Sequence, residues 1–188
     1  MLKPKILLHC CCAPCLIAPY YKLRAEGKEL SVFWFNPNIH PLGEYIKRRN
    51  TLRDFAAKEN IDLIEEDEYG LVNFLQATLK NIENRCLYCY ETRLNAVAKT
   101  AKELGYEAFS TTMLYSKYQK HELIVDIALK MSAKYGVEFY YEDWRPLWWE
   151  GRKLAKEAGL YRQQYCGCIF SEEERYREQI QRNRPTEN

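Results

Sequence analysis

Residues 5–15 read Lys-Ile-Leu-Leu-His-Cys-Cys-Cys-Ala-Pro-Cys, an apolar segment that leads directly into a group of cysteines. A short apolar run that stops at turn-forming residues is typical of a strand buried on both faces. Residues 5–10 are therefore predicted to form a strand, with the cysteines in the loop at its carboxyl end. Open parallel sheets bind ligands outside the carboxyl ends of their strands, so this loop is the first candidate site.

The rest of the chain repeats this pattern of a strand followed by a helix. Several of the predicted helices end at a glycine, which accepts the left-handed backbone that closes a helix. The alternation predicts an α/β fold in a single domain over residues 1–188, with a mostly parallel sheet flanked by helices. Residues 172–188 are predicted to be a polar C-terminal helix and tail, and no regular pattern is found over 144–168. Further strands are predicted at 30–36, 61–66, 107–110 and 137–141, and helices at 15–26, 42–59, 70–79, 88–104, 119–135 and 172–182.

Composition narrows the class of protein. With 188 residues, 47% hydrophobic, the chain is long and apolar enough to build its own core. A net charge of +2 excludes a strongly basic nucleic-acid platform but allows a local basic patch. The N-terminal apolar run ends at His9, and no stretch approaches the roughly 18 apolar residues of a membrane span. We therefore expect a cytoplasmic protein without a membrane partner, whose eight cysteines serve metal or redox chemistry rather than structural disulfides.

The cysteines form three groups along the chain. Zinc sites favour separated Cys-x-x-Cys pairs, and only Cys86 and Cys89 have that spacing. The adjacent cysteines of the first loop suit an iron–sulfur cluster better, because its irons take thiolates from several directions. Zinc alone, or small buried side chains, are the alternatives. The groups are Cys10, Cys11, Cys12 and Cys15; Cys86 and Cys89; and Cys166 and Cys168.

Cys166-Gly-Cys168 predicts a different function. One intervening residue allows only a small, strained disulfide ring, and strained disulfides tend to be labile or catalytic. The alternative is that both thiolates bind a second metal ion, either iron or zinc, and the sequence leaves both interpretations open. The loop after the first strand contains no glycine, which argues against the nucleotide-binding motifs that cradle phosphate there.

Four motifs and their order along the chain resemble those of the cobalamin-independent epoxyqueuosine reductase family. Together they extend over about residues 5–175. The chain departs from the family at Asp143-Trp-Arg-Pro146, where Asp-Phe-Arg-Lys is more common, and this puts any role for the lysine charge in doubt. The motifs are His9-x-Cys11-Cys12-Ala-Pro-Cys15, Arg85-Cys-x-x-Cys-Tyr90 with Arg93-Leu94, Thr111-Thr-Met-x-x-Ser116, and Tyr165-Cys-Gly-Cys-Ile-Phe-Ser171.

This resemblance implies a fold and an activity. The sheet should be similar to the nucleotide-hydrolase-like (HUP/PP-loop type) fold of tRNA-thiolating enzymes. The reaction implied is the reduction of epoxyqueuosine to queuosine at the wobble position of tRNA, which makes the chain an oxidoreductase. Removing the epoxide oxygen as water takes two electrons and two protons, so an external electron donor is an expected partner.

The resemblance also implies the residues of the site. It assigns a [4Fe–4S] cluster to Cys11, Cys12, Cys86 and Cys89. It assigns Cys166 and Cys168 to a redox-active pair, or, with Cys15, to a second metal ion. Cys10 occupies a position that the family motif leaves free and is not a first-choice ligand. His9 is a candidate proton donor in catalysis, and the alternative is that it orients the cysteine loop.

The second expected partner is the anticodon loop of an epoxyqueuosine-containing tRNA. Basic side chains interleaved with aromatic ones suit unstacked bases, and such residues gather near Ser116 (Lys117, Lys120) and near Arg152 (Trp148, Trp149). The basic residues of 47–53 have an equal alternative as a solvated helix face. Candidate substrate-binding residues are Tyr90, Arg93, Ser116, Trp144, Arg145, Arg152 and Lys153.

Two other functions compete with this interpretation. A tRNA-thiolating enzyme would share the cysteines, but it is expected to carry a phosphate loop at residues 9–15, which this chain lacks. A zinc-stabilised RNA-binding module is expected to be colourless when purified under nitrogen, whereas an iron–sulfur protein is brown.

Overall fold

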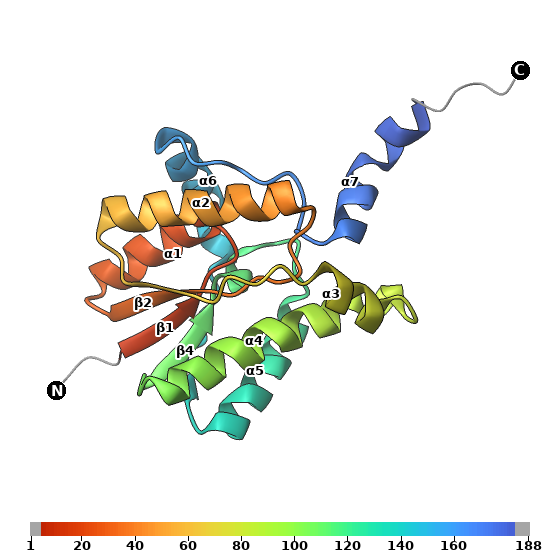
Figure 1. Cartoon of the computed structure of the whole chain (residues 1–188). Helices are drawn as coiled ribbons and strands as arrows, with labels where there is room; N and C mark the ends of the chain where they lie inside the picture. The colour runs from red at the N-terminus through yellow and green to blue at the C-terminus, as the bar shows by residue number, and fades with distance from the viewer. Residues whose placement is uncertain (1–4, 183–188) are drawn as a thin grey trace, which may run out of the picture.

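Parallel strands form the centre of the molecule, in a computed structural model that describes residues 5–182. The sheet has the order β3-β2-β1-β4-β5 (Figure 1). Chain order reverses at β1, which lies between β2 and β4, so the carboxyl end of β1 is the position where such folds bind ligands. The strands are β1 (Lys5–His9), β2 (Glu29–Trp34), β3 (Leu63–Glu65), β4 (Ala108–Thr111) and β5 (Glu138–Phe139).

The register brings three strand ends together at one edge. His9, the last residue of β1, pairs with Phe33 of β2 and with Thr111 of β4. The strand interior, Ile6 to Leu8, is fully buried. That burial on both faces explains why the sequence of β1 is a continuous apolar run rather than an alternating one.

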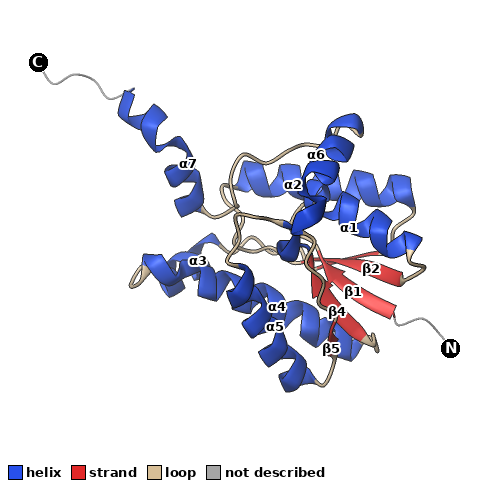
Figure 2. Cartoon of the chain, turned by 180° about the vertical axis from the view of Figure 1, so that it is seen from behind, coloured by secondary structure: helices blue, strands red, loops and turns tan. Residues whose placement is uncertain are grey.

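Helices cover both faces of the sheet (Figures 1 and 2). α1, α2 and α6 lie on one face, and α4 and α5 lie on the other. Short 3-10 segments are found at Ile82–Asn84, Thr112–Tyr115 and Arg145–Leu147. The helices are α1 (Ala13–Ala25), α2 (Leu42–Glu59), α3 (Leu71–Thr78), α4 (Arg85–Glu103), α5 (His121–Tyr135), α6 (Trp148–Glu157) and α7 (Ile169–Arg182).

The predicted α/β class and parallel sheet are confirmed, and the predicted helix at 42–59 coincides with α2. The expectation of an irregular segment over 144–168 is wrong for its first part, because α6 lies there. α6 packs against α1, and Gly151 permits this approach, since a Cβ at that position would overlap the Tyr115 hydroxyl.

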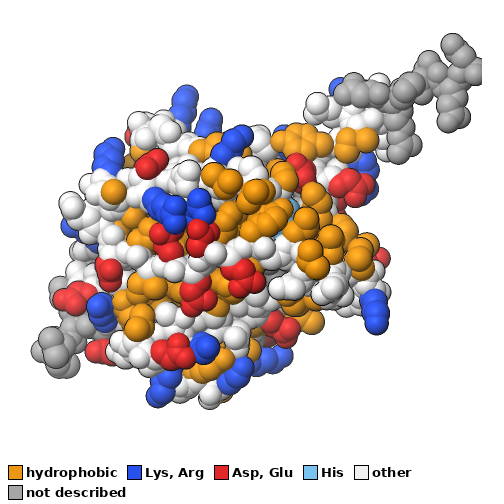
Figure 3. Space-filling view, viewed as in Figure 1, with side chains coloured by type: hydrophobic (Ala, Val, Ile, Leu, Met, Phe, Trp, Pro, Cys, Tyr) orange, Lys and Arg blue, Asp and Glu red, His pale blue; other side chains and the backbone are white. Residues whose placement is uncertain are grey.

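α7 projects away from the sheet (Figure 1). Its first turns are fastened to the body by an ion pair between Arg85 and Glu174, at 2.6 Å, and by the rings of Phe74 and Phe170, 5.9 Å apart. Hydrophobic side chains gather on the side from which α7 projects (Figure 3). The predicted tail at 183–188 lies outside the described residues. None of the helices described is both long and apolar enough to cross a bilayer.

Candidate metal and redox site

Three thiols meet at the carboxyl end of β1. The Sγ atoms of Cys11, Cys12 and Cys15 all lie within 4.8 Å of one another, and all three residues are buried. Cys12 is the N-cap of α1, so the helix start sets the directions of Cys12 and Cys15. The backbone amide of Cys11 donates to Thr112 Oγ1 at 3.3 Å, which ties the loop to the end of β4. We call these residues the three-thiol group.

Cys10 is turned away from this group. Its thiol donates to the backbone carbonyl of Cys12 at 3.3 Å. Its own carbonyl accepts a hydrogen bond from Asn36 Nδ2 at 2.9 Å, and burial raises the pKa of the Cys10 thiol well above its usual value. Cys10 therefore lies outside the group of three sulfur atoms that could hold a metal ion.

The other four cysteines come from α4 and from the segment before α7. Cys89 is buried in the first turns of α4, and burial raises its pKa to about 12, with the charges of Cys166, Cys168 and Cys86 acting in the same direction. All of these cysteines are free thiols, so Cys166 and Cys168 are not joined by a disulfide here. Cys166 is exposed.

The grouping of thiols differs from the predicted ligand set. The set implied by the family resemblance combined Cys11 and Cys12 with Cys86 and Cys89. Among the described residues, the close group instead includes Cys15, and the two cysteines of α4 lie outside it. The physical reason is local: Cys12 and Cys15 share the first turn of α1.

A buried cation accompanies the thiols. The Arg93 side chain is 3% exposed, and its Nε donates to Asn38 Oδ1 at 2.7 Å. No carboxylate in the described part of the chain pairs with it. Hydrogen bonds from Cys12 and Cys15 lower the pKa of Cys11 well below its usual value, and the charge of Arg93 acts in the same direction. A buried arginine needs a nearby negative charge, and the thiolate form of Cys11 is suited to supply it here.

A second buried arginine holds the segment that carries Cys166. We call residues 161–168 the redox loop. Arg48 of α2 is 1% exposed; its Nη1 donates to the Cys166 carbonyl at 2.8 Å and its Nη2 to the Tyr165 carbonyl at 3.0 Å. Its Nε donates to Glu44 Oε1 at 2.7 Å. The guanidinium fork thus fixes the backbone on the N-terminal side of Gly167.

Further hydrogen bonds fasten the same loop. Tyr161 donates to Glu44 Oε2 at 2.5 Å, and Tyr165 donates to the His40 carbonyl at 2.6 Å. The backbone amide of His40 donates to the Gly167 carbonyl at 2.7 Å. The redox loop is therefore held by α2 and by the segment that precedes it, although more than a hundred positions separate them in the chain.

Arg48 also corrects the interpretation of the basic residues at 47–53. Arg48 points inward, Arg49 pairs with Asp67 at 2.5 Å, and Arg53 pairs with Glu65 at 2.9 Å. Because these arginines are engaged by groups of the protein itself, the pairs favour the alternative of a solvated helix face, with Lys47 exposed on it.

Two glutamines that were not predicted from the sequence contact thiols of the site. Gln163 Nε2 lies 2.9 Å from Cys12 Sγ and 3.4 Å from Cys15 Sγ. Gln119 Nε2 lies 3.2 Å from Cys166 Sγ, and its Oε1 accepts a hydrogen bond from Tyr90 at 2.6 Å. Glutamine is neither a common metal ligand nor charged, so no motif pointed to these residues.

Both ring nitrogens of His9 have partners within the protein. Its Nδ1 lies 2.9 Å from Thr111 Oγ1 and its Nε2 lies 3.3 Å from the Phe35 carbonyl. Burial, with the charge of Arg93 added, lowers its pKa to about 4. A neutral ring with both nitrogens engaged joins the ends of β1, β2 and β4, which corresponds to the orienting alternative.

The predicted substrate-binding residues are divided between core and surface. Trp144 is 0% exposed, so its predicted role in stacking on a base is not retained. Tyr90 is buried as well and bridges α4 to Gln119. Arg145 pairs with Asp143 at 2.7 Å. Ser116 is half-buried, and Arg152 and Lys153 are exposed on α6.

Comparisons with known proteins identify the family of the chain. A family model described as "Epoxyqueuosine reductase QueH" matches residues 6–174. A protein of that name from Dehalococcoides mccartyi is 38% identical over 175 residues, with 93% of this chain and 96% of the relative covered. Another from Thermotoga maritima is 35% identical, with 88% and 89% covered.

A solved structure shares the fold. It is the U34-tRNA thiolase NcsA from Methanococcus maripaludis with its [4Fe-4S] cluster, with a TM-score of 0.56 and 15% identity. The alignment covers 98% of this chain and 69% of that one. At this identity the likeness shows the fold alone, and it confirms the predicted fold class.

Proposed function

The chain belongs to the family of epoxyqueuosine reductases named QueH, and we propose from this membership that it removes the epoxide oxygen of epoxyqueuosine in tRNA to leave queuosine. The observation that carries this proposal is the buried three-thiol group at the carboxyl end of β1, which Gln163 connects to the redox loop that carries the exposed Cys166. Such a reaction makes the chain an oxidoreductase.

The thiols fit an iron–sulfur cofactor. Cys11, Cys12 and Cys15 offer three buried sulfur donors, and the charge of Arg93 favours the thiolate form of Cys11. We propose a [4Fe–4S] cluster with these three ligands and a fourth from the Cys86–Cys89 pair. When bound, such a cluster supplies electrons at a potential set by the charges and hydrogen bonds around it.

The reaction must balance two electrons and two protons. Both C–O bonds of the epoxide break, an alkene forms, and the oxygen leaves as water. In the version that we favour, the thiols of Cys166 and Cys168 become a disulfide and release those two electrons and two protons, and the external donor then reduces the disulfide. The alternative is that these two cysteines bind a second metal ion, iron or zinc.

The other residues of the site position Cys166. The Gln119 amide contacts its sulfur, and Arg48 fixes its backbone carbonyl. Gly167 has a φ of +151°, and a Cβ there would lie 3.3 Å from Arg48 Nη1. The loop therefore uses glycine both for its backbone conformation and for the close approach of the guanidinium.

The proposed substrate is the anticodon loop of tRNA. The support comes from the names of the relatives and from a structural neighbour that is a U34-tRNA thiolase. Exposed Arg152 and Lys153 are suited to phosphate contacts, and the near-neutral net charge of +2 favours a small footprint on the RNA.

The direct test is conversion of epoxyqueuosine-containing tRNA by anaerobically purified protein with dithionite. Mass spectrometry of the digested nucleosides should show the loss of one oxygen atom. A reaction without reductant, and one with tRNA that already carries queuosine, are the controls. An iron-loaded protein that leaves epoxyqueuosine unchanged would contradict the proposal.

A further inference from the structure

An exposed lysine is surrounded by aromatic rings on the surface near the site. The Lys117 ammonium lies 5.3 Å from the ring centroid of Tyr118, 5.3 Å from that of Trp148 and 5.4 Å from that of Trp149. No carboxylate of residues 5–182 pairs with this ammonium. Tyr118 is 74% exposed and Trp149 is 73% exposed. We call these four residues the aromatic platform.

The base of the platform is built into the fold. The Trp148 ring packs on Tyr115 with centroids 5.4 Å apart, and the Tyr115 hydroxyl donates to the Trp148 carbonyl at 3.0 Å. Tyr118 meets Trp148 edge to face at 5.5 Å. Trp148 is therefore anchored, while Trp149 and Tyr118 keep most of their surface free. Large rings left exposed on an anchored support are typical of binding surfaces.

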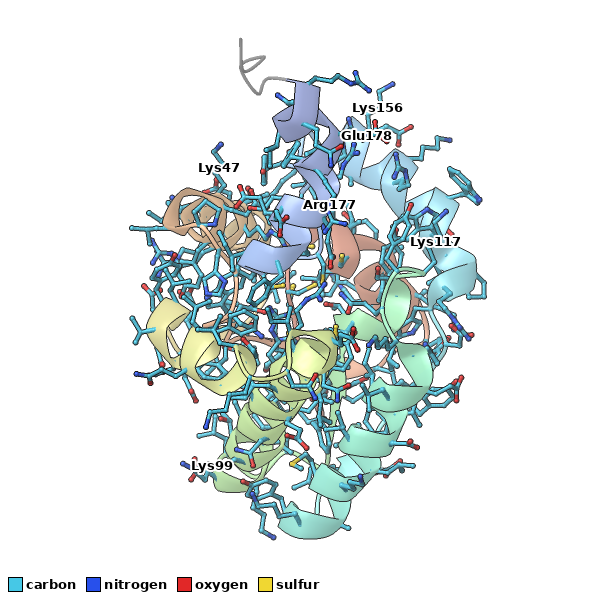
Figure 4. All side chains as sticks on the ribbon, turned by 90° about the vertical axis from the view of Figure 1, so that its right-hand side faces the viewer. Lys47, Lys99, Lys117, Lys156, Arg177 and Glu178 are labelled. Atoms are coloured by element: carbon cyan, nitrogen blue, oxygen red, sulfur yellow. The ribbon has the colours of Figure 1, made fainter. Side chains whose placement is uncertain are left out.

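The platform is connected to the thiols through neighbouring residues. Gln119, which follows Tyr118, contacts Cys166 Sγ at 3.2 Å. Beneath Trp148, the 3-10 segment Thr112–Tyr115 packs against α1, the helix that carries Cys15. In Figure 4, Lys117 lies to the right of the central region where most of the sulfur atoms are drawn. A ligand on the platform would thus adjoin the reacting group.

The charges around the rings favour a polyanion. Arg152 lies over the Trp148 ring at 5.8 Å, and Lys153 and Lys120 are exposed nearby in the chain. Glu150 is the acidic residue in the same turn of α6. Lys153 pairs with Glu157 at 3.9 Å, whereas no carboxylate of residues 5–182 pairs with Lys117 or Arg152. Exposed rings beside these two cations match the bases and phosphates of a single-stranded nucleic acid.

We propose that the aromatic platform stacks an unpaired base of the anticodon loop next to the modified one, with Lys117 at the adjoining phosphate. This inference rests on the proposed function, because that function makes a tRNA anticodon loop the substrate. It assigns binding to Trp149, Tyr118 and Lys117 in place of the buried Trp144.

The stacking is tested with Trp149→Ala and Tyr118→Ala, each beside its phenylalanine variant. Both positions are exposed, so the fold should not change. We expect each alanine variant to bind a fluorescent anticodon stem-loop about tenfold to a hundredfold more weakly, and each phenylalanine variant to retain most of the affinity, since a ring still stacks. Unchanged affinity in both alanine variants would overturn the proposal.

The phosphate contact is tested with Lys117→Ala. The slope of the logarithm of Kd against the logarithm of salt concentration should become shallower by about one unit. Lys99→Ala is the matched control, because Lys99 is an exposed lysine in the second half of α4, more than two helical turns beyond Cys89. An equal salt slope for Lys117→Ala and the wild-type protein would contradict the assignment.

Binding is measured separately from turnover, so the two proposals fail in different ways. A wild-type protein without reductase activity would overturn the proposed function, and loss of stem-loop binding by Trp149→Ala would still support the platform. The rival occupant is a protein electron donor. If Trp149→Ala bound the stem-loop normally but lost turnover only with a protein donor, and not with dithionite, the platform would be a protein-binding surface and the proposal would be overturned.

Discussion

Arg48 illustrates how much of this site depends on single buried side chains. Its guanidinium makes three hydrogen bonds, to Glu44 and to the carbonyls of Tyr165 and Cys166. The Glu44–Arg48 spacing of four residues was readable as a helical ion pair. The spacing could not show that this pair lies inside the protein and holds the redox loop. Both facts depend on a segment more than a hundred residues later in the chain.

Arg48→Lys should lower turnover by about tenfold to a hundredfold, because one ammonium cannot replace the fork and the loop would shift. Visible absorption should be retained, since the three-thiol group is unchanged. Arg49→Lys is the control, because Arg49 makes a surface ion pair with Asp67. Steady-state rates and absorption spectra of the two variants check this. Equal turnover in both variants would contradict the role of Arg48.

His40 predicts a dependence of stability on pH. Burial, with the charge of Arg93 added, lowers its pKa from 6.5 to about 4. Between these values the unfolded chain binds more protons than the folded one, so the free energy of unfolding falls as the pH is lowered through this window. Above it, the contribution is complete and constant.

His40→Asn should make that fall in stability less steep, while asparagine keeps an acceptor for the backbone amide of Ile169. Urea unfolding followed by circular dichroism at pH 7, 6 and 5 measures the slope. The remaining slope should reflect His9, whose pKa is lowered in the same way. If His40→Asn and the wild-type protein lost stability in parallel, His40 would not be the group responsible.

At the scale of elements, local pattern was sufficient for the strands and most helices but not for α6. α2 ends where its sequence predicts, and Asn60 after it takes the left-handed conformation that closes a helix. α6 contains Gly151 and has no side-chain N-cap, so the start of this helix is weakly marked, although residues 152–157 are good helix formers. Packing on α1 stabilises it, which is a tertiary effect that local propensity cannot show.

Gly151→Ala should destabilise the protein by about 1–3 kcal/mol, because its methyl group would overlap the anchored Tyr115 hydroxyl. Gly43→Ala is the matched control: it is also a helical glycine, and nothing lies within 4 Å of its Cβ position. That substitution should be neutral or stabilise α2 by up to about 1 kcal/mol. Thermal unfolding of both variants compares them, and equal melting temperatures would contradict this packing argument.

The candidate site could be predicted only in part from the sequence, because tertiary packing does not show in local sequence patterns. The cysteine motifs and their position at a strand end could be predicted, since both are local. The sequence could not predict which thiols group together or which tryptophan is exposed, because both depend on tertiary packing. Trp144 and Trp149 lie in one aromatic segment, yet one is fully buried and the other is 73% exposed.

At the scale of the whole molecule, the sheet resembles that of a known enzyme, but the loop after β1 has its own chemistry. The sheet is shared with a tRNA thiolase, but the loop at the end of β1 contains thiols and no glycine. The position where related sheets bind phosphate is here lined by sulfur donors.

Cys15→Ser should lower the iron content per chain after anaerobic purification, because Cys15 belongs to the three-thiol group. Cys10→Ser is the matched control: its hydroxyl can still donate to the Cys12 carbonyl, and we expect iron content near that of the wild-type protein. Iron analysis of the two variants measures the difference. Full iron in Cys15→Ser together with loss in Cys10→Ser would reverse the assignment.

The central claim is that Cys166 takes part in the reduction while the iron–sulfur cofactor is held by other thiols. The most direct measurement is the visible absorption and the conversion of epoxyqueuosine-containing tRNA, recorded on one anaerobic sample of Cys166→Ser beside the wild-type protein. The account predicts retained absorption and lost conversion. Conversion by Cys166→Ser at the wild-type rate would contradict it.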